Sequence, residues 1–271
     1  MLSSFAQHKK AYTIFSGEGK KTNFSKLIKK AVDKEVVLFG ELHNNPIAHW
    51  LELELTAELA KQRTLIVGAE MFESDQQEEL NLYLKDSINQ ETFSQSTSLW
   101  SNYNTDYKPL VDFAKKNKIP FIATNIPQIY ATLVYKEGFK PLETLVADEQ
   151  RFIVPQPIVF NPELPQYKKI LTMSGEHGSP KLVQAQVIRD ATMAHFILEN
   201  KTKESLFFHV NGAYHSDFKE GVLWYLNRRE PQLNTLTIST VEQDSLDKLA
   251  EENLNRADFI ICIPSTMTKT Y

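Results

Sequence analysis

The chain has 271 residues, a formal net charge of −4, 42% apolar residues and 24% charged residues. These values fit one large α/β unit or about two domains, and they exclude extended disorder, collagen and coiled coil. The slightly acidic balance argues against a nucleic-acid partner. The longest apolar runs, such as Phe259–Pro264, are far shorter than the roughly 20 residues that cross a bilayer, so no transmembrane segment is expected. The single cysteine, Cys262, excludes an intrachain disulfide and lies in an apolar run, which predicts a buried thiol.

Residues 1–23 form a predicted N-terminal lead. Ser4 and Ala6 make the small-x-small pattern of a signal-peptidase site, so residues 1–6 are interpreted as the remnant of a signal peptide. On this interpretation the protein is exported, and is periplasmic or associated with the outer membrane. The alternative is a native cytoplasmic start with a polar lead.

Short apolar runs then alternate with helical patterns. Strands are expected over Glu35–Gly40, Thr64–Ala69, Ile119–Thr124, Ser205–Val210, Leu236–Thr240 and Phe259–Ile263. Helices are expected over Phe24–Asp33, Ile47–Gln62, Gln76–Asp86, Tyr107–Asn117 and Asp217–Asn227. Strands that are apolar on both faces are typical of a buried parallel sheet. The sequence therefore predicts an α/β fold with a mostly parallel central sheet flanked by helices.

The middle of the chain differs, because no strand is expected from residue 127 to residue 200. Helices are expected there over Ile129–Lys136, Leu142–Arg151, Pro165–Met173 and Pro180–Glu199. Residues 127–200 are therefore predicted to be a helical subdomain, inserted between the third and fourth strands. Residues 24–126 and 201–271 then form the α/β domain.

Polar side chains follow four of the expected strands, and they are Glu41 with His43, Glu70, Asn125, and Tyr214 with His215. Ligands of open α/β sheets bind outside the carboxyl ends of the strands, so these side chains are expected to line one site. His43 and His215 both stand in a Gly-x-x-His sequence. Two converging imidazoles can hold a divalent metal or porphyrin iron, or act as acid and base. Glu41 and Glu70 add carboxylates that suit Mn²⁺, Fe²⁺ or Zn²⁺.

A second polar group lies on the helix expected over Pro180–Glu199. Gln186, Arg189, Asp190 and Met193 share a face at helical spacing. Arg189 can hold a carboxylate or a propionate with two hydrogen bonds. The alternative is that Arg189 pairs with Asp190 and ties the helical subdomain to the sheet.

Several common motifs are missing from the sequence. It contains no GxxxxGK[ST], GxGxxG, HExxH or GxSxG. Their absence argues against P-loop or Rossmann nucleotide binding, zincin proteases and serine hydrolases.

In their order along the chain, these motifs resemble the ChaN-like haem-binding uptake family, in a superfamily with Tiki proteases, TraB-like proteins and erythromycin esterases. The resemblance runs from about Val36 to Tyr225 and rests on the segments Gly40–His49, Gly68–Phe72, Asn125, Arg189–Ala194 and Gly212–Val222. It implies an exported bacterial protein of iron or haem uptake, with an α/β domain and a small helical domain. The family often has an acid after the first histidine, where this chain has Asn44.

The resemblance implies haem as the cofactor, a homodimer with two stacked haems and outer-membrane uptake machinery as partners. The residues assigned to the cofactor are Glu41, His43, His49, Glu70, Asn125, His177, Arg189, Asp190, Met193 and Tyr214. The axial ligand stays open among Tyr130, Tyr135, Tyr167, Met173, His177 and Tyr214.

The Tiki relatives imply an alternative, a metal-dependent hydrolase or protease. In that case Mn²⁺, Fe²⁺ or Zn²⁺ would be held by His43, His215, Glu41 and Glu70, with Glu41 or Glu70 as general base. A third alternative is an adaptor in which these side chains have no chemical role.

Overall fold

The structure is a computed structural model that describes residues 9–173 and 179–271, without the side chain of Met173. The predicted signal remnant, residues 1–6, and His177 lie outside the described residues.

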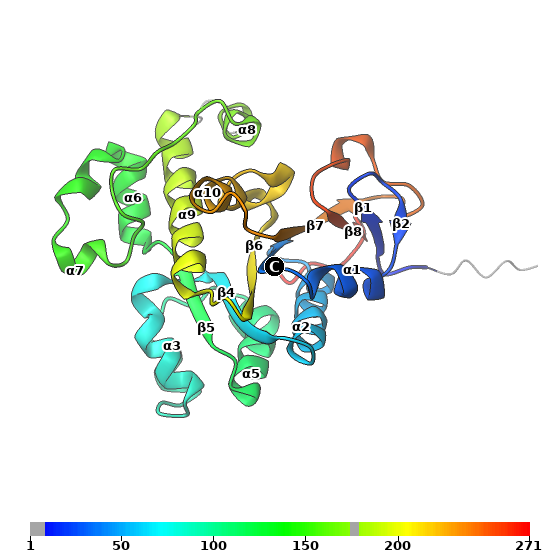
Figure 1. The fold of residues 1–271 in the computed structure, drawn as a ribbon, viewed down its shortest axis with the longest axis horizontal. Helices are drawn as coiled ribbons and strands as arrows, with labels where there is room; N and C mark the ends of the chain where they lie inside the picture. The colour runs from blue at the N-terminus through cyan, green and yellow to red at the C-terminus, as the bar shows by residue number, and fades with distance from the viewer. Residues whose placement is uncertain (1–8, 174–178) are drawn as a thin grey trace, which may run out of the picture.

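A sheet of eight strands forms the centre of the described structure (Figure 1). Its strands are β1 (Thr13–Ser16), β2 (Lys21–Thr22), β3 (Val36–Glu41), β4 (Thr64–Glu73), β5 (Phe121–Asn125), β6 (Ser205–Gly212), β7 (Thr235–Gln243) and β8 (Phe259–Pro264). Their order is β2-β1-β8-β7-β3-β6-β4-β5, and every pair from β8 to β5 is parallel. Only β1 and β2 run antiparallel to their neighbours. The predicted α/β fold with a mostly parallel sheet is confirmed.

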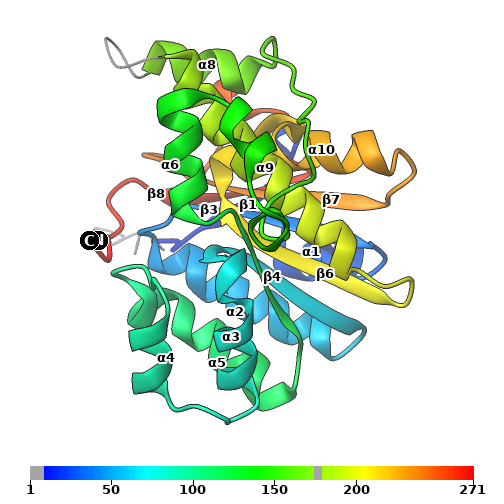
Figure 2. The ribbon, with the colours of Figure 1, turned by 90° about the vertical axis from the view of Figure 1, so that its left-hand side faces the viewer.

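Helices cover both faces of the sheet, as Figure 2 shows. The α-helices are α1 (Phe24–Ala31), α2 (Pro46–Ala60), α3 (Gln77–Leu84), α4 (Gln90–Ser96), α5 (Lys108–Asn117), α6 (Gln128–Glu137), α7 (Ala147–Gln150), α8 (Pro165–Met173), α9 (Pro180–Asn200) and α10 (Val222–Arg229). In the described residues, none of them combines the length and the apolar character that a bilayer span needs.

Alternate residues of β3 account for the two layers, because successive side chains of a strand point to opposite faces. Val37 and Phe39 pack in the core beneath α1, α2 and α5, whereas Val36 and Leu38 pack in the core beneath α9 and α10. Since both faces are covered, β3 is buried along its whole length. Cys262 is buried in β8, which confirms the predicted core thiol.

The helices between β5 and β6 have a small core of their own. Tyr130 and Val134 of α6 pack there with Leu142, Ile153 and Ile188. Ile188 belongs to α9, whose other apolar residues pack on the sheet with α10. Because α9 contributes to both cores, the boundaries at residues 127 and 200 stay a prediction.

The structure adds elements that the sequence pattern did not indicate. Strands β1 and β2 lie inside the predicted lead, where β1 pairs with β8 and buries Ile14 and Phe15. Helix α4 was also missed, because Phe93 is its only buried residue among the seven and it has no apolar stripe. Strand β4 continues to Glu73, with a register shift between Ala69 and Glu73.

Gly221, the residue before α10, has a positive φ of 52°, and a Cβ atom there would collide with the carbonyl oxygen of His215. We expect Gly221→Ala to lower the free energy of unfolding by more than the about 1–3 kcal/mol that a strained φ alone costs. Urea unfolding measures this loss. Gly138→Ala is the matched control: φ is 86° there, and the added Cβ meets only the amide end of Gln184. Equal losses in the two variants would contradict the backbone collision.

Candidate functional site

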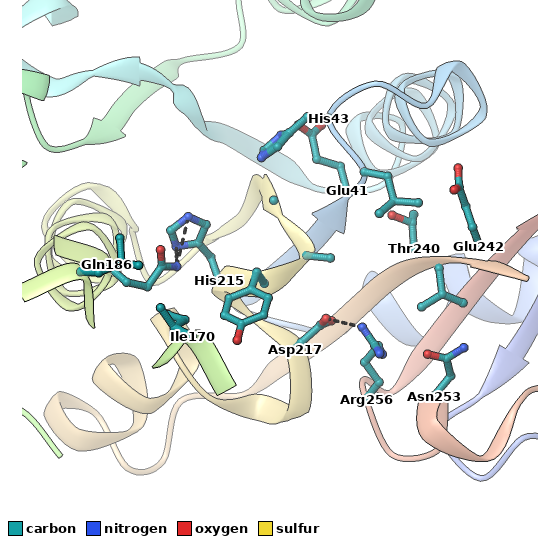
Figure 3. Close-up of a pocket in the computed structure, with 16 residues that line it drawn as sticks. Glu41, His43, Ile170, Gln186, His215, Asp217, Thr240, Glu242, Asn253 and Arg256 are labelled. Carbon is teal, nitrogen blue, oxygen red and sulfur yellow. Dashed lines mark hydrogen bonds and ion pairs between the residues drawn. The ribbon is translucent and has the colours of Figure 1, made fainter. Parts of the chain in front are cut away.

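The carboxyl ends of β3, β4 and β6 meet beside a cavity (Figure 3). Glu41 is in register with Gly212 across the β3–β6 pair, and Glu70 Oε2 accepts the backbone N–H of Gly212 at 2.7 Å. This convergence places Glu41, His43, Glu70 and His215 around one point, as their positions after parallel strands imply.

His43 is held by Glu41. Its Nδ1 lies 2.7 Å from Glu41 Oε1, which also accepts the hydroxyl of Tyr107 at 2.6 Å. The ring of Trp100 meets the imidazole edge-on at 4.9 Å, so the plane of the imidazole is fixed as well. A Cβ on Gly212 would lie 2.6 Å from His43 Nε2, and only a glycine permits this approach.

His215 is held in the same manner by Asp190. Its Nδ1 lies 2.5 Å from Asp190 Oδ1, and Asp190 Oδ2 accepts the hydroxyl of Tyr167 at 2.8 Å. Its Nε2 lies 3.2 Å from Glu70 Oε1. The site thus contains two chains of contacts, each of which runs from a tyrosine hydroxyl through a carboxylate to an imidazole. Glu70 lies beside the second imidazole.

The electrostatics follow from burial and pairing. Burial disfavours the imidazolium of His215, but the carboxylates of Glu70 and Asp190 outweigh it and raise its pKa to about 10. Burial also disfavours the carboxylate of Glu70, but His215, His43 and the Gly212 N–H lower its pKa to about 2. Burial likewise opposes protonation of His43, and its hydrogen bond to Glu41 still raises its pKa. At neutral pH His215 and Glu70 are therefore an ion pair.

Behind His43 lies a second, fully enclosed polar group. His49 Nε2 lies 3.0 Å from the carbonyl oxygen of His43, and its Nδ1 lies 3.3 Å from both Glu41 Oε2 and Glu52 Oε2. Glu52 is not among the residues that the sequence pattern indicated. The available signal was a glutamate three residues after His49 on the side of the helix that carries Leu55 and Leu59, which are buried.

The cavity in front of the imidazoles has a volume of about 610 Å³. Its apolar lining includes Leu42, Ile170 and Val241, and its polar lining includes Asp217 and Arg256, which form an ion pair of 2.7 Å (Figure 3).

A groove of about 260 Å³ between α6 and α9 shares two lining residues, Leu182 and Gln186, with this cavity. Tyr135 and Arg189 also line the groove. The cavity and the groove are called the trough below.

The structure distributes the predicted residues of α9 differently from the single face expected. Asp190 faces His215, whereas Arg189 donates to Gln128 Oε1 at 2.7 Å and to Asn125 Oδ1 at 3.4 Å. The alternative of an Arg189–Asp190 pair is therefore wrong.

Two further predicted cofactor residues have other surroundings. Met193 is fully buried in the core between the sheet and α10, and it does not line the cavity or the groove. Its cofactor contact stays a prediction. Tyr214 lines the cavity, and its hydroxyl donates to the carbonyl of Gln166 at 2.8 Å.

Comparison with known proteins decides the family. The family model described as "Haem-binding uptake, Tiki superfamily, ChaN" matches residues 27–226. The chain belongs to this family. The resemblance found in the sequence motifs is thereby confirmed.

Solved structures of low sequence identity share the fold. The structure of cofacial haem binding to ChaN of Campylobacter jejuni has a TM-score of 0.70 at 17% identity and covers 93% of this chain and 97% of that one. A mutant of the erythromycin esterase EreC in its open conformation has a TM-score of 0.55 at 10% identity and covers 96% and 99%.

A curated plant protein is similar in sequence. Protein RETICULATA-RELATED 5, chloroplastic, of Arabidopsis thaliana is 24% identical over 245 residues, which cover 82% of this chain and 32% of that protein. The chain therefore spans about a third of the length of this relative.

The ion pair of His215 predicts a pH dependence of stability. Because the folded pKa of about 10 exceeds the ordinary value of 6.5, the stabilisation is complete below pH 6.5 and is lost as the pH rises to about 10. We expect the difference in unfolding free energy between the wild type and His215→Asn to shrink over this range. Urea unfolding at a series of pH values measures it. His195→Asn is the control, since burial lowers the pKa of His195 and gives no such decline above pH 6.5. A constant difference for His215→Asn would refute the ion pair.

Proposed function

We propose that this protein binds haem in the trough, with the phenolate of Tyr135 as the axial ligand of the iron. Membership of a haem-binding family supports the cofactor, and a solved protein of the same fold is described with cofacially bound haem. The observation that carries the proposal is the exposure of Tyr135, which is 45% exposed at the edge of the groove.

The other tyrosine candidates have hydrogen-bonded hydroxyl groups or buried side chains. Tyr167 donates to Asp190, and Tyr214 donates to the carbonyl of Gln166. Tyr130 is buried in the small core beneath α6. An axial ligand must present a free oxygen, nitrogen or sulfur atom to the iron, which favours Tyr135.

The lining of the groove fits a porphyrin. Ala131, Leu182 and Ala185 supply apolar surface, and Arg189 supplies a guanidinium that suits a propionate. Bound haem would let the protein carry iron porphyrin and pass it on. Export, a homodimer with facing haems and delivery to or from outer-membrane uptake machinery belong to the same proposal.

Titration with haemin, followed in the Soret region, tests this function. The wild type is expected to bind haemin saturably, and Tyr135→Phe to bind at least about tenfold more weakly because the ligand oxygen is lost, a difference of about 1.4 kcal/mol. Tyr12→Phe, a half-buried tyrosine beside Trp50, is the matched control and should bind as the wild type does. Unchanged affinity and an unchanged spectrum in Tyr135→Phe would reject Tyr135 as the ligand, and weak, unsaturable binding by the wild type would reject the function.

A second candidate is the hydrolysis of an ester or amide, with or without a divalent metal. The observation that favours it is the anchoring of both imidazoles by carboxylates through Nδ1, which directs Nε2 of His43 toward Gly212 and Nε2 of His215 toward Glu70, where each can move a proton. Here Glu70 would orient the attacking water, and the imidazolium of His215 would stabilise developing negative charge.

A short-chain p-nitrophenyl ester is a suitable probe of this activity. His43→Asn and Glu70→Gln are expected to lower the rate of hydrolysis about 10²- to 10⁴-fold, the contribution of a positioned acid or base. Tyr12→Phe should keep the wild-type rate. Hydrolysis that survives both His43→Asn and Glu70→Gln would rule out this candidate.

A further inference from the structure

We propose that Glu41, His49 and Glu52 form a buried site for one divalent transition-metal ion of the Mn²⁺, Fe²⁺ or Zn²⁺ class, directly behind the imidazole of His43. This site is separate from the rim formed by His43, Glu70 and His215, and Glu41 joins the two because its Oε1 lies against His43 and its Oε2 faces His49. It is also independent of the proposed haem binding.

The spacing of the ligand atoms suits such an ion. One atom from each of the three side chains lies within 4.8 Å of the other two. His49 Nδ1 is 3.3 Å from Glu41 Oε2 and 3.3 Å from Glu52 Oε2. Ligands about 2.1 Å from a tetrahedral ion lie about 3.4 Å apart, so these contacts match a coordination edge. One nitrogen and two carboxylate oxygens favour the metals named.

The second nitrogen of His49 fixes the first for coordination. Nε2 lies 3.0 Å from the backbone carbonyl oxygen of His43, an acceptor only, so Nε2 carries the proton and donates it. Nδ1 forms ion pairs with the two carboxylates, so it carries a proton that a metal ion would displace on binding to this nitrogen. Metal-bound histidines have this arrangement, in which the distal N–H donates to a carbonyl or carboxylate.

Two buried carboxylate oxygens lack a hydrogen-bond donor among the described residues. They are Glu41 Oε2 and Glu52 Oε1, in side chains of residues that are 2% and 1% exposed. Glu41 Oε2 faces His49 Nδ1, toward the centre of the group. Because buried polar atoms are nearly always hydrogen-bonded, these two oxygens have capacity to spare for a bound ion.

Charge leads to the same conclusion. Glu41, Glu52 and Asp106 are all buried, and within residues 9–173 and 179–271 their ion pairs are formed with histidines alone. Asp106 Oδ2 also accepts from Asn102 at 2.6 Å, a hydrogen bond that brings no charge. Burying several carboxylates with so little positive charge is costly. A divalent ion that displaces the Nδ1 proton of His49 would add one net positive charge, and the competing solution is a proton shared by Glu41 and Glu52.

Metal analysis of the refolded chain separates these two solutions. The full chain is unfolded with a chelator, refolded with Zn²⁺ or Co²⁺, dialysed and analysed by elemental mass spectrometry. We expect about one ion per chain, and a higher melting temperature than for the chelated protein, because binding to the native state adds to its stability. Glu52→Gln and His49→Asn should lose the ion. Glu70→Gln and His215→Asn, at the rim, should keep it.

The proposal is overturned if the wild type refolds in the presence of Zn²⁺ without binding it and its melting temperature does not change. A proton shared by Glu41 and Glu52 then accounts for the buried carboxylates. Retention in Glu52→Gln with loss in His215→Asn would also overturn it, because the ion would lie at the rim. Should the variants fail to fold, the Co²⁺ form of the wild type decides. A d–d absorption band of tetrahedral intensity that Zn²⁺ abolishes supports the site, and its absence refutes it. Haemin titration of the same samples reports separately on the proposed function.

Discussion

Burial of carboxylates at the carboxyl edge of the sheet is the constraint on which this structure depends. Glu41, Glu52, Glu70, Asp106 and Asp190 are each 6% exposed or less. Removing so many charges from water costs several kcal/mol for each group unless a partner compensates it. The ion-pair partners found for them in the described structure are imidazoles, so this edge is held together by histidines.

That constraint explains how separate elements are fixed on the sheet. Tyr107, which immediately precedes α5, donates to Glu41, and Tyr167 of α8 donates to Asp190 of α9. Each helical layer therefore contributes a hydroxyl to a carboxylate that orients an imidazole of the rim. Burial and the neighbouring carboxylates keep these phenols protonated, because they raise the pKa of both tyrosines. The apolar packing of the two layers and the hydrogen bonds of the rim thus position the same helices on the sheet.

Much of this arrangement follows from local sequence, and the rest depends on packing that local sequence does not encode. The parallel strands were predictable because runs such as Ser205–Val210 are apolar on both faces, and parallel strands bring Glu41, Glu70 and His215 to one edge. Glu52 was not predictable as a partner of His49, because its role depends on α2 being buried beneath the rim.

The orientation of α9 is a second feature that local sequence does not predict. Neighbouring residues of a helix differ in direction by about 100°, so Arg189 and Asp190 face different surfaces although they are adjacent. Asp190 meets His215, and Arg189 lies toward Gln128 of α6. Sequence spacing placed Gln186, Arg189, Asp190 and Met193 together, but only packing decides which of them reaches the trough.

The protonation and contacts of the histidine ring nitrogens also limit where a haem iron could bind. The side chain of His215 is 8% exposed, and its two ring nitrogens lie against Asp190 and Glu70. A ring whose nitrogens are both protonated has no lone pair for iron, and freeing one would leave a buried carboxylate unpaired. His43 has more exposure, but its Nε2 is pressed against the backbone of Gly212. The rim therefore suits proton transfer and charge stabilisation, whereas the exposed side chain of Tyr135 in the groove suits the axial ligand that we propose.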